Sequence, residues 1–61
     1  MNEVIEIFMR RDGMTKREAV ERFKELRKEV AEILQEGGGY NEVEDLLLGE
    51  MLEMDYAFYF I

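Results

Sequence analysis

Five residue types are missing from this chain of 61 residues: cysteine, histidine, serine, tryptophan and proline. Without cysteine and histidine the chain can form no disulfide and lacks the usual ligands of a zinc site. The common nucleophile–base pairs of enzymes, Ser–His and Cys–His, cannot be built from it. The glycines at 37–39 are not followed by the Lys-Ser/Thr of a phosphate-binding loop. We therefore expect a protein that is not an enzyme, with no catalytic residue, no metal site and no cofactor.

Basic residues are confined to the first half of the sequence. All eight lie between Arg10 and Lys28, and the net charge of the whole chain is −7. Residues 1–28 hold eight bases and six acids, giving +2, whereas residues 29–61 hold nine acids and no base, giving −9. Such an excess of negative charge disfavours long-range attraction to nucleic acid or to an anionic membrane.

Long apolar runs are also missing, and none approaches the ~20 residues that span a bilayer. The first ten residues have no basic start, and Glu3 and Glu6 interrupt their apolar residues, so they do not resemble a signal peptide. We expect a cytoplasmic protein that makes no membrane contact.

The clearest local pattern predicts a long helix from Thr15 to Glu36. Thr15 and Glu18 have the spacing of a capping box, in which each side chain bonds the backbone N–H of the other residue. Glycines from Gly37 onward end the helix, because glycine adopts the left-handed C-cap at least cost. The apolar stripe at helical spacing comprises Ala19, Phe23, Leu26, Val30 and Ile33, widened by Val20 and Leu34.

Two shorter helices are expected on either side. One begins near Asn2, and a third is capped by Asn41, with Glu44 completing a second box. Asp55 is expected to cap a final helical turn. The predicted fold class is therefore all-α, a small three-helix domain over residues 1–61 that ends in an aromatic turn. An α+β arrangement with paired terminal strands is the alternative, since short apolar runs fit either the helical or the strand period.

Apolar residues of the third helix cover a wider arc than one neighbouring helix can bury. Leu48 and Leu52 lie about 100–140° around the helix from the face that carries Val43. A domain this small gains stability from association, so we expect a protein partner or a second copy in a homodimer at this surface. The predicted contact residues are Leu48, Leu52, Tyr56, Phe58, Tyr59 and Phe60.

The acidic second half suggests a second hypothesis, a nucleic-acid mimic that inhibits a host DNA-binding or defence enzyme. In the alternative interpretation these acids serve solubility and helix capping. Direct nucleic-acid binding is not expected, because acids are interleaved with the bases at 10–17. The candidate mimic surface comprises Glu36, Glu42, Glu44, Asp45, Glu50, Glu53 and Asp55.

Several segments carry a family resemblance that spans nearly the whole chain. They are Arg11–Thr15 with Glu18-Ala19, the glycine turn with Tyr40, Glu44–Leu47, and Leu52–Tyr56. Together they resemble a group of small acidic proteins encoded by phages and prophages of gut and Gram-positive bacteria. The resemblance implies an all-helical fold and a mobile-element origin, hence a bacterial host cytoplasm, and it assigns no activity to any residue. In that group a glycine precedes the Leu-Glu segment, whereas here Met51 occupies that position and Gly49 falls earlier.

Overall fold

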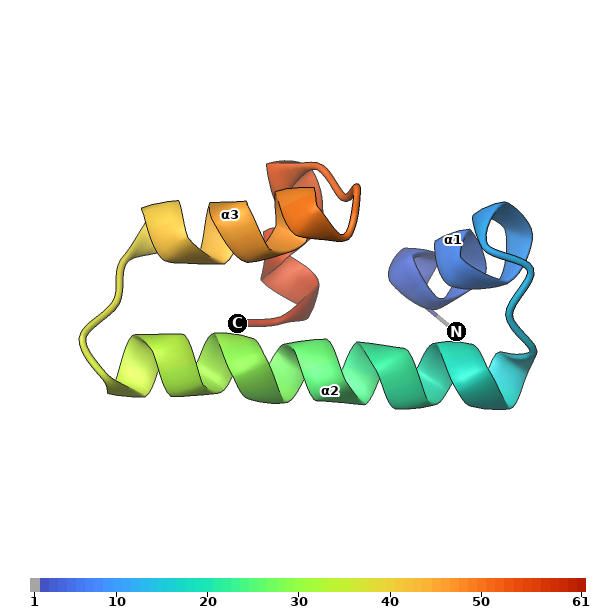
Figure 1. Cartoon of the computed structure of the whole chain (residues 1–61), viewed down its shortest axis with the longest axis horizontal. Coiled ribbons are helices and arrows are strands. Elements are labelled where there is room, and N and C mark those ends of the chain that lie inside the picture. The colour runs from blue at the N-terminus through green and yellow to red at the C-terminus, as the bar shows by residue number, and fades with distance from the viewer. Residues whose placement is uncertain (1) are drawn as a thin grey trace.

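A long central helix is the axis on which every other element packs. The computed structural model describes residues 2–61 and contains α1 (Glu3–Arg11), α2 (Lys16–Gln35), α3 (Tyr40–Gly49) and the 3-10 helix η1 (Met54–Tyr59). α1 lies over the N-terminal half of α2, and α3 runs back over its C-terminal half (Figure 1). The molecule measures 34 × 18 × 17 Å, and its length is close to the roughly 30 Å of a 20-residue helix.

The predicted all-α class is confirmed. The two segments that might have paired as strands are helical instead, the first in α1 and the second in η1. No strand occurs within residues 2–61, so the α+β alternative is wrong. Val4, Ile5 and Phe8 are buried on one side of α1, which is possible because a helix repeats every 3.6 residues. A strand would instead place Val4 and Ile5 on opposite faces.

The predicted capping box of α2 is formed, and α1 begins near Asn2 as predicted, with Asn2 as its N-cap. The Ile5 backbone N–H donates to Asn2 Oδ1 at 2.9 Å. At the start of α2 the Glu18 N–H donates to Thr15 Oγ1 at 3.2 Å, and the Thr15 N–H donates to Glu18 Oε1 at 2.9 Å. These hydrogen bonds, chiefly the one from the Thr15 backbone, lower the pKa of the Glu18 carboxyl because they stabilise its ionised form.

The predicted cap of α3 is wrong. α3 begins at Tyr40, one residue before the predicted cap, and Gly39 occupies the N-cap position with no side-chain hydrogen bond. Asn41 therefore lies inside the helix, where its side chain cannot serve as the cap. Asp55 likewise lies inside η1, whose N-cap is Glu53.

In each of these three α-helices the residue that follows the C-cap has a positive φ. Gly13 (φ 68°) and Gly37 (φ 84°) do so without steric cost, as the glycine positions in the sequence predict. α3 ends instead at Met51, whose φ is 58°. The Met51 N–H donates to the Leu48 carbonyl and the Leu52 N–H to the Leu47 carbonyl, each at 2.9 Å. This pair of bonds is a Schellman motif with methionine where glycine is usual.

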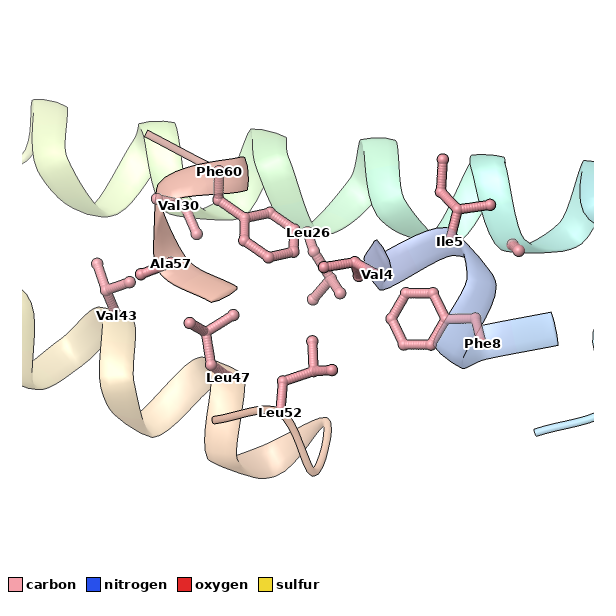
Figure 2. Packing of buried hydrophobic residues seen from close by; sticks show 11 residues of the cluster. Val4, Ile5, Phe8, Leu26, Val30, Val43, Leu47, Leu52, Ala57 and Phe60 are labelled. Carbon is pink, nitrogen blue, oxygen red and sulfur yellow. The ribbon is translucent and has the colours of Figure 1, made fainter. Parts of the chain in front are cut away.

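One apolar core joins all four helices. Figure 2 shows side chains from α1, α2, α3 and η1 pointing into the same interior, with Phe60 from the C-terminal end among them. The ring centroids of Phe60 and Phe23 lie 5.0 Å apart. Within residues 2–61 no polar or charged residue is buried. The buried apolar residues are Val4, Ile5, Phe8, Ala19, Leu26, Val30, Val43, Leu47, Leu52, Ala57 and Phe60.

Candidate functional site

Two of the predicted contact residues belong to the core. Leu52 is only 2% exposed and Phe60 is also buried, so the prediction that they face a partner is wrong. The prediction assumed that α3 continues through Leu52, but α3 ends at Gly49. The left-handed turn at Met51 then carries Leu52 back toward Leu47 and the interior (Figure 2).

The other predicted contact residues stay at or near the surface. Leu48 is 58% exposed and Phe58 is 67% exposed. Tyr56 and Tyr59 are half-buried and pack against the core. The Phe58 and Tyr59 rings stack with centroids 4.2 Å apart, and those of Tyr56 and Tyr59 lie 6.4 Å apart. Phe58 is therefore an exposed ring held by a neighbour that is itself anchored in the domain.

Met51 is an exposed apolar residue close to the predicted contact residues that was not among them. Met51 is 78% exposed because the left-handed turn directs its side chain outward, and Ile61 is exposed at the chain end. The local sequence does not mark this turn, because methionine disfavours the left-handed conformation that it adopts here. We call Leu48, Met51, Phe58 and Ile61 the C-terminal apolar set.

The candidate mimic residues do not form one uniform acidic surface. Glu50 is half-buried and forms an ion pair with Arg22, whose Nε donates to Glu50 Oε1 at 3.2 Å. The same guanidinium reaches Glu25 Oε2 at 3.2 Å. The hydrogen bond to Glu50 is the main reason that the pKa of Arg22 is raised. Glu50 is thus neutralised within the fold, while the remaining six are exposed: Glu36, Glu42, Glu44, Asp45, Glu53 and Asp55.

A second arginine binds the same end of α3. Arg11 Nη1 donates to the Met51 carbonyl at 2.7 Å, and Arg11 Nη2 donates to the Glu50 carbonyl at 2.9 Å. The other edge of the guanidinium donates twice to the Asp12 carboxylate, each time at 2.9 Å. This pairing lowers the pKa of Asp12 and raises that of Arg11. Arg11 and Arg22 thus place two cations at a helix C-terminus, where the helix dipole favours positive charge.

Acidic residues gather around an open groove at the opposite end of the molecule, where α2 ends and α3 begins. The groove has a volume of about 330 Å³. A Cβ at Gly38 would lie 2.5 Å from Glu42 Oε2 and 2.8 Å from the Ile33 carbonyl oxygen, so only glycine allows the Glu42 carboxylate so close to the end of α2. We call this the acidic groove, and it is lined by Glu29, Glu32, Ile33, Glu36, Glu42 and Leu46.

Two further features bear on ligands and surroundings. In the part of the chain that the structure describes, no three acidic side chains are arranged to hold a metal ion. No helix over residues 2–61 has the length and apolar character needed to cross a membrane. Comparison of the chain with protein-family models, with curated proteins and with solved structures finds no match.

Proposed function

We propose that this chain is a non-enzymatic protein-binding domain of phage or mobile-element origin, acting in the bacterial cytoplasm on a host or phage protein. The observation that supports the proposal most is the C-terminal apolar set. Its four large side chains are exposed although the domain already has a core that includes none of them. Exposed apolar patches often mark binding surfaces, so these side chains are candidates for contact with another molecule.

Phe58 is the best candidate for the central contact. Aromatic side chains are enriched in the cores of protein interfaces and supply much of the binding energy. Stacking on Tyr59 restricts the Phe58 ring before any partner arrives. A ring that is already ordered loses less conformational entropy on binding, which raises the affinity obtained from the same contact area.

A separate protein fits the charge of this region better than a second copy does. Glu53 is the N-cap of η1 and Asp55 lies in its first turn, and both are exposed. In a symmetric dimer each copy would bring its own Glu53 and Asp55 to the interface, and like charges placed together cost affinity. A partner with apolar side chains and a basic rim avoids that repulsion.

Capture experiments with matched variants test the proposal. The tagged chain is incubated with nuclease-treated bacterial lysate at two salt concentrations and compared with Leu48→Lys/Phe58→Lys. Tyr40→Lys is the control, because Tyr40 is exposed at the opposite end of α3. We expect a stoichiometric protein partner that the double variant loses and the control retains. Equal capture by all three proteins would remove the C-terminal apolar set from the function.

Capture and sedimentation together test the other two functions, a nucleic-acid mimic and a homodimer. A nucleic-acid mimic would capture a DNA-handling enzyme that is released at high salt and that is insensitive to the change at Leu48 and Phe58. A homodimer would be seen in sedimentation of the pure chain, with a shift to monomer in the double variant. Either result would contradict the proposal of a separate protein partner at this surface.

A further inference from the structure

The three α-helices differ in how the negative end of the helix dipole is balanced. α1 carries Arg10 and Arg11 in its own last turn. α3 has no base in its last turn, and Arg11 and Arg22 reach it from α1 and α2. α2 has no base in its last turn either, and no base is found around the acidic groove at its end. Among the α-helices within residues 2–61, only α2 has no cation at its C-terminal end.

The acidic groove adds carboxylates to this same helix end. Glu29, Glu32 and Glu36 come from α2, and within residues 2–61 none of them forms an ion pair. Glu42 joins them from α3 through its close approach to Gly38. Carboxylates near a helix C-terminus are unfavourable, because the helix dipole places partial negative charge there. The fold therefore holds like charges together, and the two at the end of the helix, Glu32 in the last turn and Glu36 at the C-cap, destabilise α2.

Two apolar side chains lie among the carboxylates that line the groove, so it is not a purely acidic patch. Ile33 and Leu46 line it and are both only half-buried. A second open depression on α2 differs in charge, because Arg17 and Arg22 lie there among three glutamates and offset part of their charge. Of these two depressions within residues 2–61, the acidic groove is the one that combines uncompensated negative charge with accessible apolar side chains.

We propose that the acidic groove binds a basic amphipathic segment of a partner protein. Lysine or arginine side chains of that segment lie against the carboxylates and the C-terminal carbonyls of α2, and an apolar side chain covers Ile33 and Leu46. Charge complementarity selects this occupant over a second copy, since two chains of net charge −7 repel each other. The inference rests on the proposed role in protein binding but uses a surface separate from the C-terminal apolar set.

Two labelled peptides and two charge-matched variants of the full chain provide the test. One 15-residue peptide alternates lysine and leucine at helical spacing, and the other replaces every leucine by serine. Glu32→Gln/Glu36→Gln removes two charges from the groove. Glu44→Gln/Asp45→Asn removes two charges from exposed positions of α3 that do not line it. Fluorescence anisotropy gives the affinities, and amide chemical shifts locate the bound peptide.

We expect the leucine peptide to bind more tightly than the serine peptide and to shift the amides of the groove. Its affinity should fall about three- to tenfold in Glu32→Gln/Glu36→Gln, as expected for two exposed ion pairs, and less than twofold in the control. The free groove variant should also melt roughly 2–6 °C higher than the unmodified chain at low salt. Equal binding of the two peptides, equal losses in both variants, or shifts away from the groove would overturn the proposal.

The outcome is independent of the capture experiment at the C-terminal apolar set. Loss of the captured partner in Leu48→Lys/Phe58→Lys, together with a negative peptide result, would leave the proposed function standing and reject only the groove. A positive peptide result without any captured partner would reject the proposed contact surface and keep the groove.

Discussion

Replacing Met51 by glycine should stabilise the domain. Met51 has φ 58°, in the left-handed region where a Cβ collides with the backbone. That conformation costs ~1–2 kcal/mol for a residue with a side chain, and glycine avoids it. Glycine in turn costs ~0.5–1 kcal/mol through the greater freedom of the unfolded chain. The net gain in the free energy of unfolding is about 0.5–1 kcal/mol, or a rise in Tm of roughly 2–8 °C for a domain of this size.

The side chain itself contributes little to the fold. Met51 is 78% exposed, and the bonds that fix the turn come from its backbone N–H and carbonyl groups, which glycine keeps. Met51→Ala is therefore the matched control, because it shortens the side chain but retains the Cβ. Thermal unfolding followed by circular dichroism measures both variants. If Met51→Gly were no more stable than Met51→Ala, the strain assigned to this position would not exist.

Three further changes probe the core, the capping box and the ionised side chains. Leu52→Lys should abolish the cooperative unfolding transition because it buries a charge, whereas Leu48→Lys should leave circular dichroism and Tm nearly unchanged. Thr15→Ala should lower the free energy of unfolding in urea by about 1 kcal/mol, by removing the hydrogen bond to the Glu18 N–H. Asp12 and Glu18 have lowered pKa values in the folded chain, so their contribution to stability is complete above their ordinary values near pH 4 and is lost as the pH falls below them. Tm measured between pH 2.5 and 6 should therefore decline toward acid, and Glu18→Gln should flatten part of that decline.

Local sequence signals predicted the helix ends correctly at α2, where those ends depend on residues close in the chain. The box of Thr15 and Glu18 and the left-handed Gly37 follow from short-range hydrogen bonds and backbone sterics. The apolar period of α2 likewise marks its buried side, with Ala19, Leu26 and Val30 inside. The all-α class follows from these signals, because caps and period agree over the long helix.

Only the tertiary structure decided where α3 ends and which leucine faces water. Arg11, distant in sequence, holds the carbonyls of Glu50 and Met51 and so stabilises a left-handed methionine that local preference disfavours. That turn buries Leu52 and leaves Leu48 exposed, although helical spacing alone put both on one face. The acidic groove has the same origin, since Glu42 meets the end of α2 only after the chain reverses at its glycines. Contacts between residues far apart in the chain carry no periodic signal, and they alone fixed both candidate surfaces.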